Sequence, residues 1–305
     1  MDDPTAEQTR DDAEVSAEPV TSEIAHSASA ESSQTSRAGR NLPAAIAVGV
    51  GLGALVAIAL VIAPVAFVVV VAIALVIAVW ELRQALAERS LHVPFVPVAV
   101  GAVSMVVAAY RAGPEALVLA ATLTCVAVLL WRAADGVSGA AARDVAAGLL
   151  TVLYPCFLAG FAILMVAEPE GRWRIFTFIV LVVASDVGGY AAGVTLGKHP
   201  MAPALSPKKS WEGMAGSVVF AMVVGAVVVP LVFSAGVWWH GALLGLLVAP
   251  VATIGDLVES SIKRDLGLKD MSNLLPGHGG LMDRLDSLVL VAPVVWAVLR
   301  LVAPH

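Results

Sequence analysis

Long apolar runs dominate the chain after residue 40, and each is about as long as a bilayer is thick. Residues 68–79 are apolar without alternation, unlike the short alternating strands of a membrane β-barrel. A transmembrane helix needs about 17–25 mostly apolar residues. We therefore predict an all-α, polytopic membrane protein of about nine transmembrane helices, over 43–62, 64–81, 94–110, 114–131, 145–166, 175–195, 214–235, 238–257 and 286–303.

Composition agrees with this class of protein. The 305 residues are 59% hydrophobic and 14% charged, with a mean hydropathy of +0.89, whereas soluble domains have about 45–50% apolar and about 25% charged residues. The only cysteines in the sequence, Cys125 and Cys156, fall inside apolar runs. We interpret them as small buried hydrophobic residues, so no disulfide framework is implied.

The first 40 residues have a different composition, rich in Ser, Ala, Glu and Asp. They hold nine acidic and three basic residues, and because the rest of the chain is balanced they carry the whole formal net charge of −6. Such a segment cannot bury enough apolar surface to order itself, so we predict a disordered acidic tail rather than a signal peptide. A partner-binding role for the tail stays open. The predicted organisation is thus a tail (1–40), N-terminal membrane helices (41–172) and a C-terminal catalytic region (173–305).

The distribution of Lys and Arg predicts the orientation. With the N-terminus inside and the spans alternating, fourteen of these residues fall inside and four outside. Cytoplasmic segments of membrane proteins carry this excess of positive charge. We therefore expect a cytoplasmic N-terminus and two cytoplasmic polar clusters, at 185–213 and 260–286.

The C-terminal polar cluster mixes bases, acids and glycines between two apolar runs. Asp256, Glu259, Ser260 and Lys263 are spaced to share one helical face, and beyond the loop Asp283 and Asp286 share another. Two helix ends that present carboxylates to each other would hold a hard divalent cation, although ion pairing with nearby Lys and Arg is the alternative. His278, between two glycines, is predicted to contact phosphate, and no second His or Cys lies near it for a zinc site.

The other cluster contains an acid in the membrane and a pair of lysines. Asp186 lies within an apolar run and is expected to face a polar cavity, or else to form a helix–helix hydrogen bond. Neighbouring glycines would allow close approach to a ligand or to another helix. Ser206-Pro207 predicts a helix start, with Lys208, Lys209 and Ser210 in the first turns, where an anion would use both the amides and the ammonium groups. Simple positive-inside anchoring is the alternative for these lysines.

The residues of 260–286 carry a resemblance to a known family. The string SSIKRDLGLKDMSNLLPGHGGLMDRLD resembles the full signature of the phosphatidate cytidylyltransferase, or CDP-diacylglycerol synthase, family, with no departure. The stretch from Asp186 to Gly213 is also similar, with Val187, Gly189 and Ser210 as mild departures. The resemblance covers roughly 175–303, agrees with the first five spans in number only, and excludes the tail.

The resemblance implies a cytoplasm-facing enzyme of the cell membrane that joins CTP and phosphatidic acid to give CDP-diacylglycerol and pyrophosphate. It implies Mg²⁺, with K⁺ beside it, a homodimer, and no nucleic-acid partner. The implied metal ligands are Asp256 and Asp283. The implied catalytic residues are Asp256, Lys263, Arg264, Lys269, His278, Asp283, Arg284 and Asp286. The implied substrate-binding residues are Asp186, Ser206, Lys208, Lys209, Ser210, Ser260, Gly279 and Gly280.

Three other functions fit parts of the sequence. A related enzyme could activate a different lipid phosphate or a polyprenol with CTP. An ion-coupled transporter could use Asp186 and Asp256, but it predicts matching broken helices in both halves, and the polar motifs all follow residue 184. A structural membrane scaffold would leave the paired acids and the glycine-rich turn without a purpose.

Overall fold

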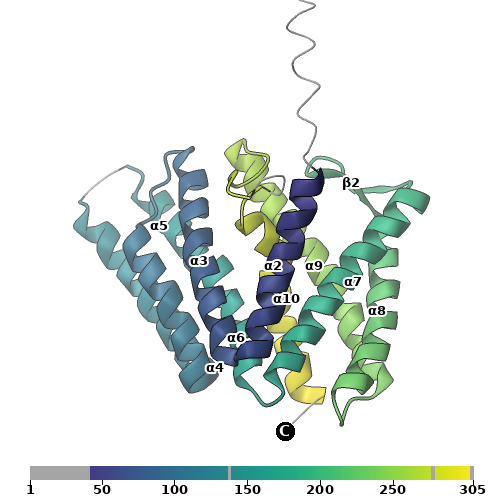
Figure 1. Cartoon of the computed structure of the whole chain (residues 1–305). Helices are drawn as coiled ribbons and strands as arrows, with labels where there is room; N and C mark the ends of the chain where they lie inside the picture. Colours follow the sequence, from purple (N-terminus) through teal and green to yellow (C-terminus); the bar gives the residue numbers. More distant parts are fainter. Residues whose placement is uncertain (1–41, 137–138, 276–278, 303–305) are drawn as a thin grey trace, which may run out of the picture. The chain divides into compact units, whose positions relative to one another are not determined.

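The computed structural model describes residues 42–136, 139–275 and 279–302, with side chains from residue 47. The predicted tail and His278 therefore lie outside the described residues. Within those ranges the chain is helical apart from one short β-hairpin (Figure 1). Its elements are α2 (Leu42–Ile62), α3 (Pro64–Ala87), α4 (Phe95–Ala134), α5 (Ala141–Thr151), the π-helix η1 (Val152–Phe157), α6 (Leu158–Ala167), α7 (Gly171–Leu196), β1 (Pro200–Ala202), β2 (Ser206–Ser210), α8 (Trp211–Val232), α9 (Trp238–Leu266) and α10 (Met282–Val302).

The predicted polytopic all-α class is confirmed. Among the described residues, seven helices are long and apolar enough to cross a membrane, and 47–62 forms a shorter apolar helix. Helix α4 covers two predicted spans and breaks at Gly113, where φ is 81°. A Cβ at Gly101 would clash with Thr124, so the two arms fold back against each other. The total of nine spans and the cytoplasmic N-terminus stay predictions.

One membrane span has a π-helix in its middle. Residues Ala141–Ala167 form a continuous span in which η1 separates α5 from α6. Pro155 lies inside η1 and has no N–H to donate to the preceding turn. Single π-turns of this kind occur often at functional sites. The wider turn buries Tyr154 and Cys156 in the protein interior.

Small residues bring α7, α8 and α9 close together. A Cβ at Gly188 of α7 would lie 2.6 Å from the carbonyl oxygen of Gly216 on α8. Further along α8, Gly225 meets Gly241 of α9 in the same way. Membrane helices pack through such glycines because no hydrophobic force drives them together. The glycines that follow Asp186 therefore have a structural explanation as helix contacts.

The predicted helix start at Ser206 is wrong. Residues Ser206–Ser210 form strand β2, which pairs antiparallel with β1. Helix α8 begins at Trp211, and the Ser210 hydroxyl caps it by accepting a hydrogen bond from the Gly213 N–H at 3.1 Å. Serine is a good capping residue at either position, but the helix directly follows Ser210, whereas Ser206 is followed by the rest of the strand. Lys208 and Lys209 thus lie on a strand, and the argument from the helix dipole no longer applies to them.

The β-hairpin and the α9–α10 loop lie at the same end of the helix bundle, and α10 finishes at the opposite end (Figure 1). Glu212 in the first turn of α8 holds the hairpin by accepting hydrogen bonds from the N–H groups of Lys198 and His199 at 3.1 and 3.2 Å. The two polar clusters predicted from the sequence therefore share one end of the bundle.

Candidate active site

Two lysine–aspartate ion pairs organise this end of the bundle. Lys263 and Asp283 form the buried pair, which joins α9 to α10. Lys209 and Asp256 form the accessible pair, which joins β2 to α9. These four residues were all predicted as site residues, and the structure shows which lysine meets which acid.

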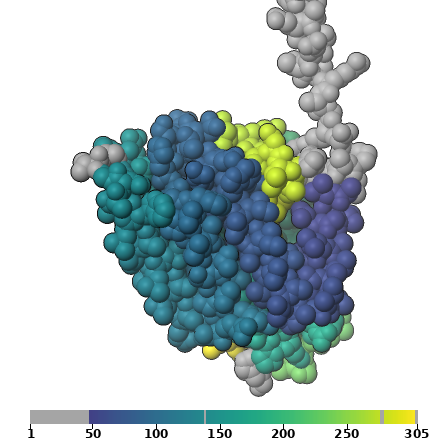
Figure 2. Space-filling view, turned by 60° about the vertical axis from the view of Figure 1, so that its left-hand side comes forward, coloured from purple at the N-terminus to yellow at the C-terminus, as the bar shows by residue number. Residues whose placement is uncertain are grey.

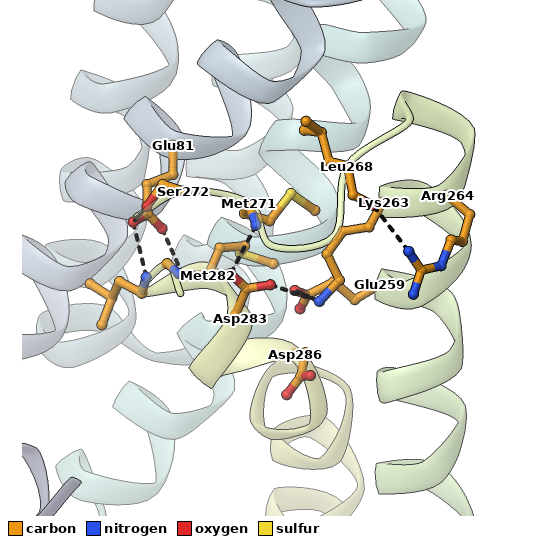
Figure 3. A network of polar contacts seen from close by, with 12 residues as sticks. Glu81, Glu259, Lys263, Arg264, Leu268, Met271, Ser272, Met282, Asp283 and Asp286 are labelled. Atoms are coloured by element: carbon orange, nitrogen blue, oxygen red, sulfur yellow. Dashed lines mark hydrogen bonds and ion pairs between the residues drawn. The ribbon is translucent and has the colours of Figure 1, made fainter. Parts of the chain in front are cut away.

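The buried pair is part of a larger network around Asp283 (Figure 3). The Lys263 ammonium lies 2.7 Å from Asp283 Oδ1 and 3.0 Å from Glu259 Oε1. Asp283 Oδ2 accepts hydrogen bonds from the backbone N–H groups of Met271, at 2.8 Å, and Gly280, at 2.7 Å. The side chains of Glu259 and Asp283 are 0% and 1% exposed. Asp283 therefore ties two separate stretches of the α9–α10 loop to α9.

The accessible pair has a different environment. Lys209 Nζ lies 2.6 Å from Asp256 Oδ2, and the two side chains are 26% and 32% exposed. The other contact of the ammonium is a long one, 3.5 Å to the carbonyl oxygen of Thr253. Both groups can therefore reach a ligand from solvent.

Further carboxylates surround Asp256. The Asp286 side chain is close enough to interact with Asp256 directly, and Asp186 lies within the electrostatic reach of Asp256, Lys209 and Arg284. Three helices, α7, α9 and α10, thus contribute acids to one place. Adjacent carboxylates repel each other unless a cation or a proton lies between them.

This acid cluster offers oxygen ligands of the kind that Mg²⁺ prefers, and the metal itself stays a prediction. Across the described ranges no three His, Cys, Asp or Glu side chains are grouped as a complete metal site. Mg²⁺ does not need one, because it binds through one or two carboxylates, water and substrate phosphates. Asp256 and Asp286 fit that donor set. The role of Asp283 as a ligand stays a prediction, since here its two oxygens accept bonds from Lys263, Met271 and Gly280.

The remaining predicted site residues fall into two groups. The basic side chains of Lys208, Arg264, Lys269 and Arg284 are exposed, and Ser206 and Ser260 are partly exposed. The glycines have packing reasons of their own. Gly279 has a positive φ of 78°, and a Cβ there would lie 2.9 Å from Asp283 Oδ2. Direct contact of these residues with substrate stays a prediction.

Sequence reasoning missed Glu81. It lies near the end of α3, is 0% exposed, and binds the loop before α10. Figure 2 shows the yellow-green α9–α10 region lying against the blue surface of α3. The sequence does contain a signal for this residue: Glu81 follows directly on an apolar run, and a carboxylate at such a place needs a partner.

Tyr154 was missed as well. It is 7% exposed, and its hydroxyl is buried without a hydrogen-bond partner in the described part of the chain. The charges of Glu259, Asp286 and Asp256 all act on it, so it lies beside the acid cluster. No sequence pattern pointed to Tyr154, since its approach to the acids depends on how η1 packs.

Comparison with known proteins identifies relatives for nearly the whole described chain. Residues 43–302 match the model of the Cytidylyltransferase family. The phosphatidate cytidylyltransferase of Mycobacterium leprae is 40% identical over 283 residues, covering 88% of this chain and 90% of that protein. The enzyme of the same name from Mycobacterium bovis is 38% identical, with 88% and 91% coverage. The one from Pseudomonas aeruginosa is 39% identical over 58% of this chain and 65% of its own.

Proposed function

We start from the fact that this chain belongs to the cytidylyltransferase family, and propose that it transfers the cytidylyl group of CTP to phosphatidic acid, releasing pyrophosphate. The observation that carries the proposal is the match to proteins named phosphatidate cytidylyltransferase along 88% of the chain. The product is CDP-diacylglycerol, a precursor for phospholipid synthesis. A phosphate oxygen of the lipid attacks the α-phosphorus of CTP, and the bond to pyrophosphate breaks.

The site has the groups that this transfer needs. Phosphoryl-type transfers depend mainly on positioning and on neutralising negative charge, without a protein nucleophile. The accessible pair offers an ammonium group from Lys209, and two further exposed cations are Lys208 on the same strand and Arg284 on α10. We assign these cations to the phosphates of the two substrates.

Mg²⁺ is the cofactor that we propose, held by the acid cluster around Asp256. When bound, it would neutralise triphosphate oxygens and assist the leaving pyrophosphate. Asp256 and Asp286 offer adjacent carboxylates, and Asp283 is the further predicted ligand. Without a cation these acids repel one another, so Mg²⁺ binding is expected to be strongest when the nucleotide also contributes oxygens.

We also propose that the protein lies in the plasma membrane and that its site is on the cytoplasmic side. The lipid phosphate is confined to the surface of a leaflet, and both polar clusters lie at one end of the membrane helices (Figure 1). CTP is cytosolic, and Lys and Arg are concentrated on the segments at this end. A homodimer is the expected assembly, and the mass of the purified protein in detergent tests it.

The direct test is pyrophosphate release by purified protein in detergent. We expect release that requires CTP, phosphatidic acid and Mg²⁺ together, and that chelation of the metal abolishes. Replacing CTP by ATP should give little product. A panel of other lipid phosphates, including polyprenyl phosphate, tests the acceptor. Activity only with another member of the panel would overturn phosphatidic acid as the substrate, and no release with any member would overturn the proposed reaction.

A further inference from the structure

Among the described residues, the hydrogen bonds of the Glu81 side chain all come from the α9–α10 loop and the first residue of α10 (Figure 3). Its Oε1 accepts hydrogen bonds from the Ser272 hydroxyl at 2.6 Å and from the Leu281 N–H at 2.9 Å. Its Oε2 accepts one from the Met282 N–H at 2.8 Å. Glu81 is 0% exposed. A buried carboxylate is costly unless hydrogen bonds satisfy it, and here the α9–α10 segment supplies all three.

These contacts make Glu81 a helix cap from a distant part of the chain. The first N–H groups of a helix have no partner within the helix, and Leu281, which precedes α10, has no side-chain oxygen to offer. Glu81 supplies two oxygens from α3, as many as 201 positions away. A negative charge at a helix N-terminus is also favourable. The start of α10 is therefore fixed in space by α3.

We propose that Glu81 is a positioning residue for the transfer reaction, acting through the first turn of α10. That turn carries Asp283, which meets Lys263, and the next turn carries Asp286, which meets Asp256. Glu81 sets where these carboxylates lie relative to α9. The inference rests on the proposed function for its role in catalysis, but its structural part can be tested without activity.

Gly280 shows how closely this contact is packed. A Cβ at Gly280 would lie 2.9 Å from Glu81 Oε2, 3.0 Å from Glu81 Oε1 and 3.0 Å from the Ser272 hydroxyl. A side chain at this position would press on the carboxylate, and glycine leaves the space for it. The close approach follows from the same placement of Glu81 as the hydrogen bonds and agrees with them.

The first test compares Glu81→Gln with Glu88→Gln. Glutamine keeps the shape of Glu81 but turns an NH₂ group toward the Met282 N–H, where an acceptor is needed. Displacement of catalytic groups by about 1 Å can cost on the order of 100-fold in rate. We expect kcat to fall roughly 10- to 100-fold while the KM for CTP stays near that of the parent. Glu88 lies just past the end of α3 and is exposed, so Glu88→Gln should behave as the parent.

A double-mutant cycle links the effect to the loop. Ser272→Ala removes one of the three bonds, so we expect a smaller loss of kcat than with Glu81→Gln. The combined variant should lose less than the product of the two single losses, because both act on the same contact. If the loss of kcat in the double variant equals the product of the two single losses, the proposal that Glu81 acts through its contact with the loop would be overturned. If Glu81→Gln does not fold, Ser272→Ala carries the test alone, and kcat equal to the parent's would then overturn the proposal.

A labelling experiment reads the position of the loop without activity. Met271 is 4% exposed and lies in the loop, so Met271→Cys in a Cys125→Ser background should react slowly with a maleimide. Adding Glu81→Gln should speed the reaction about 10-fold or more, on the scale of a lost buried hydrogen bond, and adding Glu88→Gln should not. Unchanged labelling together with parental kcat would overturn the role of Glu81. An inactive parent with faster labelling would instead overturn the proposed function and leave the structural role supported.

Discussion

The two lysine–aspartate pairs have the same chemistry but different surroundings. In the buried pair, Asp283 is 1% exposed and its oxygens accept three hydrogen bonds or ion pairs from groups on the loop and α9. In the accessible pair, Asp256 is 32% exposed and pairs with Lys209. Breaking a buried ion pair costs about 3–5 kcal/mol, whereas an exposed pair contributes about 0–1 kcal/mol.

This difference assigns different roles to residues of similar type. The buried pair ties the α9–α10 loop to α9. In our proposal the accessible pair exchanges its partners for substrate groups, so that Lys209 binds phosphate while Asp256 binds a cation. Stability and activity should therefore separate between the two pairs, and the predictions below test that separation.

The largest effect is expected for Asp283→Asn. The amide cannot neutralise Lys263, and its NH₂ group cannot accept the N–H bonds of Met271 and Gly280. We expect the free energy of unfolding to fall by about 3–5 kcal/mol, with loss of activity. Thermal unfolding in detergent measures the stability, and pyrophosphate release measures the activity. Asp265→Asn, at an exposed position of α9, is the control and should leave both unchanged. Parental stability for Asp283→Asn would show that the buried pair does not hold the loop.

The next effect is expected for Asp256→Asn, on activity alone. Both side chains of its ion pair with Lys209 are partly exposed to solvent, so the free energy of unfolding should change by less than about 1 kcal/mol. Activity should fall by about 100-fold, the scale of losing one electrostatic contact to the transition state. The CTP- and Mg²⁺-induced rise in Tm should also shrink. A loss of stability as large as that of Asp283→Asn would remove the distinction between the two pairs.

These pairings explain how far the sequence alone could go. Apolar runs fixed the membrane class, because a bilayer imposes length and composition on its helices. The spacing of Asp256, Glu259 and Lys263 placed them correctly on one helix, α9. It could not show that Lys263 chooses Asp283 while Lys209 chooses Asp256, since those choices depend on how separate elements pack.

Two further failures have the same origin. Ser206-Pro207 carries a local signal for a helix start, but pairing with β1 draws these residues into a strand. Tertiary contact outweighs such local preferences. Glu81 binds a segment about 200 positions away, and a contact between residues so far apart cannot be predicted from a local sequence pattern. The signature of 260–286 thus predicts the site, while Glu81, which binds the start of α10 from α3, lies outside that signature.

A smaller effect is expected for Gly280→Ala, which tests how tightly the loop of the buried pair is packed. The added methyl group would lie 2.9 Å from Glu81 Oε2, so the Glu81 carboxylate or the loop must shift. We expect a destabilisation of about 1–3 kcal/mol, as for overpacking in a core, and a several-fold loss of kcat. Gly53→Ala in α2, where a Cβ meets nothing within 4 Å, is the matched control in the same unfolding and activity assays. Tolerance of Gly280→Ala with full activity would mean that the loop is looser than the buried pair implies.

The smallest effect is expected for Tyr154→Phe, beside the acids of the accessible pair. The Tyr154 hydroxyl is buried without a hydrogen-bond partner among the described residues, so its removal breaks no hydrogen bond with them and relieves the cost of burying a hydroxyl. Stability should stay the same or rise. The hydroxyl also lies near Asp256 and Asp286, where it can donate a hydrogen bond to a ligand, so kcat/KM for CTP should fall a few-fold, equivalent to about 1 kcal/mol. Tyr190→Phe on α7, which is 75% exposed, should change neither quantity. Lower stability for Tyr154→Phe would reveal that the hydroxyl serves the fold, and Tyr154 would then belong with the buried pair.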